Sequence, residues 1–180
     1  MSNMNNPFVF EGRCWKFGDD VSNDDGLMER SYFRNRVFDA DVLAPHVLEP
    51  LRPDFAENAK PGDVIVAGRR FCEGNPHPQG CLGLKRRGVA AIVESVQNTP
   101  YRLMVTMGVP FLPFAKGVRA LVKDGDSVRL DIATGAFENL TSGETIRYDP
   151  LPEFLLEIIA AGGSKEHLRR RLIAAGKIEA

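Results

Sequence analysis

One glycine-rich segment, residues 68–83, holds most of the side chains suited to chemistry. It contains Glu73, His77 and two of the three cysteines, Cys72 and Cys81. A histidine can act as a base near neutral pH, and a partly buried carboxylate can do so because burial raises its pKa. Cysteine and histidine also bind zinc, but no fourth ligand is evident nearby. The sequence therefore predicts no metal site in this chain and buried thiols.

Basic residues flank the same segment, at positions 69–70 and 85–87. Small residues ahead of a helix leave backbone N–H groups free to receive an anion, so this is a candidate anion-binding loop. A plain connector between two elements is the alternative interpretation. The other two histidines, His46 and His167, fall in helical patterns and are predicted to be surface residues.

The elements on either side of this segment form a recognisable unit. Val64–Ala67 is a short run rich in β-branched residues, typical of a buried strand. Residues 82–87 are predicted to be helical, and Gly88 is a natural helix stop before a second apolar run, Val89–Val93. Strand, loop, helix and strand make a βαβ unit with parallel strands and a right-handed crossover. The candidate segment therefore directly follows a buried strand.

The first part of the chain is predicted to contain short elements. Residues 1–10 are expected to be a flexible tail, and residues 13–17 an edge strand. Asp41 is placed to cap a helix within residues 27–49, and Asp54 to begin a brief helical turn.

The second half is predicted to be a β meander that ends in helices. Gly, Asp and Asn clusters separate its apolar runs, which are residues 103–109, 111–114, 118–122, 127–132 and 145–148. Residues 123–126 have the composition of a hairpin turn. Pro152 opens a helix that runs to Ile159, and Ser164 is expected to cap a final helix. The predicted buried face of that final helix consists of Leu168, Leu172 and Ile173.

Length and charge restrict the classes of function. A chain of 180 residues with 43% hydrophobic residues suits one globular domain. The formal net charge of −1 gives no indication of a nucleic-acid or membrane partner, and no apolar run approaches the roughly 20 residues of a spanning helix. An odd number of cysteines and no signal-peptide pattern favour a reducing, cytoplasmic location.

Several segments resemble, in the same order, the small subunit or swivel domain of the aconitase superfamily, in particular isopropylmalate dehydratase small subunits. Asp24 falls on the characteristic aspartate of that family, although Ser22 and Asn23 replace the usual Asp and Thr. The matching segments are residues 12–20 (GRCWKFGDD), 51–56 (LRPDFA), 60–68 (KPGDVIVAG) and 151–163 (LPEFLLEIIAAGG).

The resemblance implies an α/β fold: a swivelling β/β/α domain over residues 11–180, with a small mixed sheet or barrel-like β core and flanking helices. It also implies a large partner subunit that carries a 4Fe-4S cluster, and a small hydroxy-dicarboxylic acid as substrate, as in leucine biosynthesis. Such a cluster needs several converging thiolates, usually with a close pair in sequence, and this chain has no such pair. We therefore expect the partner to hold the cluster, and this chain to bind no cofactor.

The family's active-site loop reads Gly-Ser-Ser-Arg-Glu, where the first Ser is the catalytic base and the Arg binds a substrate carboxylate. Without a gap, Gly74 matches the glycine of this motif, Asn75 the base and His77 the arginine, while Pro76 and Pro78 replace the second Ser and the Glu. An amide has no useful basicity, and a histidine lacks the permanent charge and fork geometry of arginine. By resemblance, Asn75 and His77 are the candidate catalytic positions and Gly74 a substrate-binding one.

A second segment resembles the family's specificity loop, which carries a Tyr-Leu-Arg type sequence. Residues 32–35 (YFRN) follow Asp24 at a fitting distance, so Tyr32 and Arg34 are the matching substrate-binding candidates. The alternative is an exposed arginine beside a packed aromatic residue. Three functions remain open: a hydro-lyase small subunit, a non-catalytic binding or regulatory subunit with the same fold, or an enzyme of changed chemistry with His77 or Glu73 as base.

Overall fold

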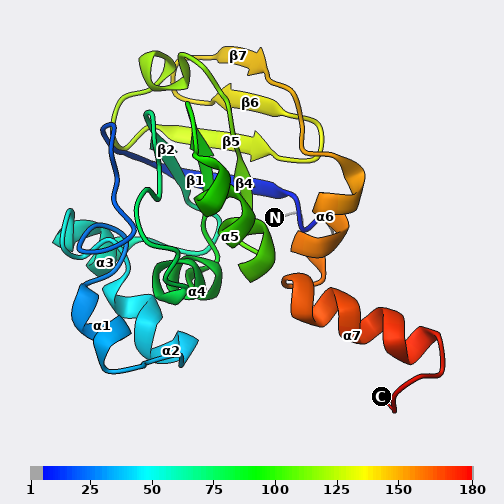
Figure 1. The fold of residues 1–180 in the computed structure, drawn as a ribbon. Coiled ribbons are helices and arrows are strands. Elements are labelled where there is room, and N and C mark those ends of the chain that lie inside the picture. The colour runs from blue at the N-terminus through cyan, green and yellow to red at the C-terminus, as the bar shows by residue number, and fades with distance from the viewer. Residues whose placement is uncertain (1–5, 180) are drawn as a thin grey trace.

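The computed structural model describes residues 6–179 as one mixed sheet with helices against it (Figure 1). The strands lie in the order β4-β3-β2-β1-β5-β6-β7. They are β1 (Val9–Lys16), β2 (Val64–Ala67), β3 (Ala90–Val93), β4 (Phe111–Leu112), β5 (Ser127–Asp131), β6 (Ala136–Asn139) and β7 (Glu144–Arg147). The helices are α1 (Arg30–Arg34), α2 (Ala40–Leu43), α3 (Pro53–Asn58), α4 (Gln79–Arg87), α5 (Asn98–Met107), α6 (Glu153–Ala160) and α7 (Ser164–Ala174), with short 3-10 turns at Ala44–His46 and Val118–Leu121. The expected α/β class with a mixed sheet is confirmed.

The predicted βαβ unit is present. β2 and β3 are parallel neighbours joined by the loop and α4, and every residue of both strands is buried. Such continuous apolar runs are typical of parallel strands that are covered on both faces. Gly88 ends α4 in the left-handed conformation at φ 74°, which glycine adopts without steric cost. The loop before α4 is thus held between two rigid elements.

β1 is central, and the prediction of an edge strand is wrong. It pairs in parallel with β2 through Cys14–Lys16 and antiparallel with β5 through Val9–Arg13. The strand begins at Val9, so the last two residues of the predicted tail belong to the sheet, while residues 1–5 lie outside the described part. β1 therefore joins the parallel half of the sheet to the antiparallel half.

Several other local predictions are wrong. Asp39, not Asp41, caps α2, since its side chain accepts a hydrogen bond from the Asp41 backbone N–H at 2.9 Å. Residues 103–107 belong to α5 and residues 118–121 to a 3-10 turn, so two predicted strands of the meander are helical. The turn at 123–126 forms, but the element before it is this 3-10 turn and no hairpin results. β6 was not predicted.

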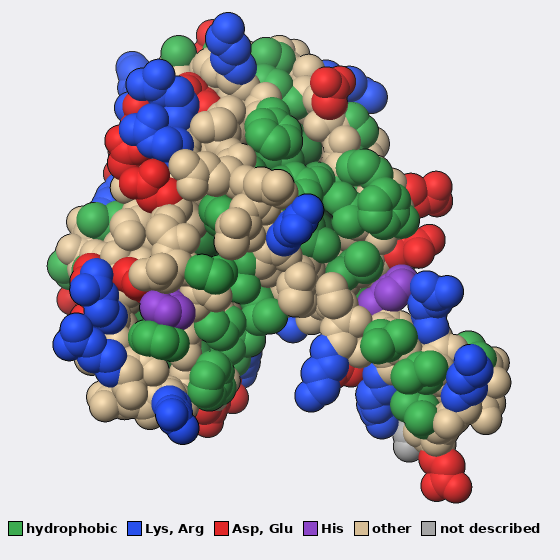
Figure 2. All heavy atoms as spheres, viewed as in Figure 1, with side chains coloured by type: hydrophobic (Ala, Val, Ile, Leu, Met, Phe, Trp, Pro, Cys, Tyr) green, Lys and Arg blue, Asp and Glu red, His purple; other side chains and the backbone are tan. Residues whose placement is uncertain are grey.

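Both C-terminal helices form, but the second does not bury the predicted face. α7 begins at Ser164 after Gly163, with no side-chain cap, and none of its residues is fully buried. Leu168 is 56% exposed. Figure 2 shows hydrophobic and basic side chains exposed together on this projecting helix. No helix among residues 6–179 is both long and apolar enough to cross a bilayer.

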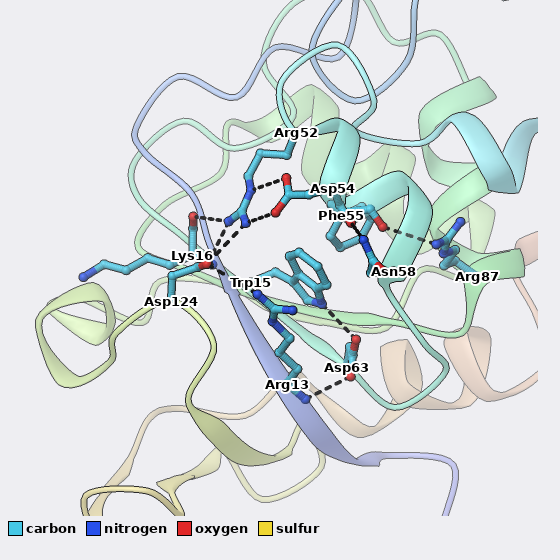
Figure 3. Close-up of polar contacts among 10 residues, drawn as sticks. All are labelled: Arg13, Trp15, Lys16, Arg52, Asp54, Phe55, Asn58, Asp63, Arg87 and Asp124. Carbon is cyan, nitrogen blue, oxygen red and sulfur yellow. Dashed lines mark hydrogen bonds and ion pairs between the residues drawn. The ribbon is translucent and has the colours of Figure 1, made fainter.

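One buried carboxylate fixes β1 against the turn before β2 (Figure 3). Asp63 accepts hydrogen bonds from the Trp15 indole at 2.8 Å, the Arg13 backbone N–H at 2.9 Å and the Lys60 backbone N–H at 2.9 Å. Trp15 is fully buried, and the Arg13 guanidinium lies 4.0 Å from its ring centroid.

Candidate functional site

The loop between β2 and α4 is attached to the segment after β1. The Asn23 backbone N–H donates to the Glu73 carbonyl at 2.7 Å, and the Glu73 N–H donates to the Val21 carbonyl at 3.2 Å. Ser22 and Glu73 consequently form a short parallel bridge. The sequence signals for the two segments lie about fifty residues apart, yet the fold places them side by side.

The loop backbone adopts unusual conformations. Arg70 and Cys72 have φ of 56° and 59°, in the left-handed region that side chains disfavour, and Gly74 has φ of 102°. Left-handed non-glycine residues persist only where the surrounding structure holds them, and they concentrate at functional sites. Gly74 therefore has a backbone role in the turn, and its role in substrate binding stays a prediction.

The buried side chain of Asn23 holds the tip of the loop. Its amide nitrogen donates to the Asn75 carbonyl at 2.5 Å and to the His77 carbonyl at 2.8 Å. The His77 backbone N–H closes a tight turn onto the Asn75 carbonyl at 2.8 Å. The residue that replaces the family's Thr thus fixes the backbone of both candidate catalytic positions.

Asp24 brings the two candidate catalytic side chains together. One of its carboxylate oxygens lies 2.7 Å from His77 Nδ1, and the other accepts from the Asn75 amide at 3.3 Å. Arg30 lies further off, with Nε 3.9 Å from the carboxylate. The side chains of Asp24 and His77 are only 10% and 21% exposed, so the contact between them is largely shielded from water.

Phe33 covers the imidazole. Its ring stacks on His77 with the centroids 3.4 Å apart and the planes inclined by 14°. Phe33 stands between the two predicted substrate-binding residues of α1, and sequence reasoning passed over it. A large aromatic residue in a short polar segment was the available signal, but its partner is fixed only by the tertiary fold.

The structure places Tyr32 and Arg34 differently from the loop residues. Tyr32 packs against the core and against His46, with the ring centroids 5.3 Å apart, and burial raises the pKa of its hydroxyl. Arg34 is exposed and lines a shallow hollow of about 260 Å³ together with Asp25 and Arg30. Neither residue hydrogen-bonds to the loop among the described residues, so their role remains a prediction.

The thiols are buried, as predicted. Cys72 hydrogen-bonds Cys81, and this contact, together with burial, raises the pKa of Cys81 well above its ordinary value. Burial raises the pKa of Cys14 to about 12. Protonated thiols are poor metal ligands, and residues 6–179 contain no group of three or more Cys, His, Asp or Glu side chains placed to hold a metal. The cysteines of this chain therefore do not fit an iron–sulfur cluster.

The arrangement is suited to proton transfer and to anion binding. A neutral imidazole that donates Nδ1–H to a carboxylate leaves Nε2 as a basic lone pair, whereas a protonated one can bind a carboxylate. The described residues offer no hydrogen bond to His77 Nε2. The chemistry of the loop thus rests on His77. Its Nδ1 contacts Asp24, and this contact orients the ring and therefore Nε2.

No family model matches this chain, but known proteins do. It is 35% identical to the isopropylmalate/citramalate isomerase small subunit of Methanocaldococcus jannaschii, over 91% of this chain and 96% of the relative. It is 38% identical to the methanogen homoaconitase small subunit of Methanothermobacter thermautotrophicus, over 88% and 90% of the two chains. The chain belongs to the family of 3-isopropylmalate dehydratase small subunits.

The fold agrees with this family membership. The crystal structure of 3-isopropylmalate dehydratase from Methanocaldococcus jannaschii superposes with a TM-score of 0.84 at 31% identity, covering 94% of this chain and 98% of the other. The family fold is therefore present over 94% of this chain. By the resemblance described above, the chain differs from the family motif in the side chains of the loop, at Asn75 and His77.

Proposed function

We propose that this chain is the small subunit of a heteromeric hydro-lyase, which dehydrates and rehydrates a small hydroxy-dicarboxylic acid as 3-isopropylmalate dehydratases do. The proposal rests on the extent of the similarity, which spans about nine-tenths of this chain and of its relatives. A complete small-subunit fold is thus combined with a loop on which polar side chains converge. In this proposal residues 11–180 act as one swivelling domain in the cytoplasm.

The partner in this proposal is a large subunit that carries a 4Fe-4S cluster. When bound there, the cluster supplies a Lewis acid for the departing hydroxyl group. The residues of this chain do the remaining work: the swivel domain closes over the substrate, excludes water and brings its loop against the reacting carbon. Gly74, Asn75 and His77 face the substrate from the loop, and Tyr32 and Arg34 select its side group.

Reconstitution tests the proposal. The chain is co-expressed with a candidate large subunit from the same genome, and the complex is purified under anaerobic conditions. 3-Isopropylmalate and citramalate are then assayed by the ultraviolet absorbance of the unsaturated acid. We expect a stable complex and turnover of at least one substrate. A complex that forms but turns over neither compound nor homologous hydroxy-dicarboxylic acids contradicts the hydro-lyase function.

A non-catalytic subunit is the second candidate, and one observation favours it: the loop has neither the serine nor the arginine of the family motif. Such a subunit would keep the partner surface and regulate or stabilise the large subunit. The reconstituted complex separates the two functions, because a non-catalytic subunit would form the complex and leave it without hydratase activity.

A further inference from the structure

We propose that Asp24 and His77 together form the proton-transfer group of this chain, in place of the serine base of the family. His77 Nε2 accepts the proton from the substrate carbon, and Asp24 holds the imidazole in position. The inference rests on the proposed hydro-lyase function, and it names the residue that performs one of its steps. The aligned motif alone does not lead to this pair, because His77 stands at the position of an arginine and Asp24 lies outside the motif.

The geometry fixes the tautomer. Asp24 accepts from His77 Nδ1 at 2.7 Å, and an ionised carboxylate can only accept hydrogen bonds, so Nδ1 carries the proton. In the neutral imidazole, Nε2 then holds the lone pair. A carboxylate in this position also stabilises the imidazolium that forms when Nε2 takes up a proton. Asp24 is only 10% exposed, which strengthens that interaction relative to one in bulk water.

The ring is held on a second side. The stacked Phe33 ring, at 3.4 Å between centroids, fixes the plane of the imidazole and covers one of its faces. The two Asn23 hydrogen bonds fix the backbone of the same loop, at 2.5 Å and 2.8 Å. Orientation of a base by several contacts reduces the reorganisation that proton transfer requires.

The neighbouring side chains are less suited to the task. Asn75 has no basic atom, and its amide donates to Asp24 at 3.3 Å. Glu73 lies 3.5 Å from the Arg70 guanidinium, so its carboxylate already has a cationic partner. Asp24 already uses both carboxylate oxygens. Among the titratable residues of the loop, His77 is the one with an oriented ring and an unengaged basic nitrogen.

The step balances without a redox reaction. In dehydration, the C–H bond beside the carbinol carbon breaks and its proton goes to His77 Nε2. The electron pair of that bond becomes the second bond of the C=C group, and the C–O bond breaks as hydroxide leaves to the Lewis-acidic site of the partner subunit. Rehydration reverses the step, and the imidazolium returns its proton to carbon.

Three variants test the proposal in the reconstituted complex, with 3-isopropylmalate and citramalate as probes. His77→Asn keeps a donor near the Nδ1 position and removes the base. Asp24→Asn keeps the shape of the carboxylate and removes its charge, and the double variant measures their coupling. His46→Asn is the matched control, because His46 also pairs with a carboxylate, that of Glu49 at 2.6 Å, but outside the loop.

We expect His77→Asn to lower kcat by roughly 10²-fold or more, the usual contribution of general acid–base catalysis, with KM changed less than about threefold. Asp24→Asn should lower kcat by at least about tenfold, and the double variant should be no slower than His77→Asn, because residues that act as a unit are not additive. His46→Asn should retain the wild-type kcat. A raised KM with unchanged kcat in His77→Asn would overturn the proposal and make His77 a carboxylate anchor.

A spectroscopic readout is independent of turnover. In the full chain with ¹⁵N-labelled histidine, His77 should show the Nδ1-protonated tautomer, and Asp24→Asn should reduce its population. An Nε2-protonated tautomer in the wild-type chain overturns the inference. If the wild-type complex is inactive, the proposed function fails; if it is active and His77→Asn is equally active, only this inference fails.

Discussion

Two nearly buried aspartates, one directly before β2 and one against the loop that follows β2, show how this molecule separates support from chemistry. Asp63 accepts from the Trp15 indole and two backbone N–H groups, none of which changes its protonation state near neutral pH (Figure 3). Asp24 interacts instead with the side chains of His77 and Asn75, both on an irregular loop. One carboxylate thus fixes the scaffold, and the other holds the groups that can react. The same residue type takes opposite roles because its donors differ.

The largest effect should come from removing the scaffold carboxylate. Asp63→Ala leaves the fully buried Trp15 indole and two backbone N–H groups without their acceptor. We expect a loss of about 3 kcal/mol in the free energy of unfolding, or roughly 10 °C in Tm. Asp24→Ala should cost only about 1 kcal/mol, since its donors are two side chains on an irregular loop, which can turn to other partners. Urea unfolding followed by the fluorescence of Trp15, the sole tryptophan, measures both; equal losses would contradict the division of roles.

The next effect is steric and concerns the same scaffold. A Cβ at Gly12 would lie 2.6 Å from an Asp63 carboxylate oxygen and 2.9 Å from the Gly62 carbonyl oxygen. Gly12→Ala should therefore cost about 2 kcal/mol, by displacing the carboxylate oxygen that accepts from the Arg13 backbone N–H. Gly18→Ala is the matched control, because nothing lies within 4 Å of a Cβ there. Thermal unfolding distinguishes the two, and a loss at Gly18 as large as at Gly12 would refute the steric explanation.

A smaller effect depends on pH and concerns the attachment of the loop. The backbone N–H and then the guanidinium of Arg69 donate to Asp19 and hold the pKa of its carboxyl below the usual value. Because the folded-state pKa is the lower one, this stabilisation is present above about pH 4 and is lost as pH falls through the folded pKa. Asp19→Asn should thus be less stable than wild type at pH 7, and the difference should shrink below about pH 4. Urea midpoints between pH 7 and pH 3 measure it; a constant difference would contradict this origin.

Local sequence patterns predicted the parts of the fold that local forces decide. The β-branched run of β2, the stop at Gly88 and the run of β3 were each visible in a few residues. The position of β1 was not, because its antiparallel partner β5 lies more than one hundred residues away. α5 was missed because its apolar residues read as a strand, although the buried Met104 and the exposed Arg102 and Thr106 follow a helical period.

The candidate site was predicted in the same uneven way. Alignment with the family placed Asn75 and His77 in the loop, because a motif can be located from the order of the residues alone. Their partners depend on which segments the sheet brings together, so Asp24 was noted only as a family residue and Phe33 not at all. Sequence reasoning assigned no role to Asn23, which by resemblance replaces the family's Thr, because its two hydrogen bonds to the loop depend on the tertiary fold.

The smallest expected effect concerns His46, which is compared with His77. His46 and Glu49 are 39% and 50% exposed, against 21% and 10% for His77 and Asp24, although both pairs are equally short. An exposed pair gains little, because water and salt screen it and two side chains lose freedom. We expect His46→Asn to change the free energy of unfolding by less than about 0.5 kcal/mol.

Chemical unfolding of the two single variants, His46→Asn and His77→Asn, at pH 7 provides the test. If His46→Asn costs as much as His77→Asn, shielding from water is not what distinguishes the pair at the loop, and the case for a special role of Asp24 must rest on kinetics alone.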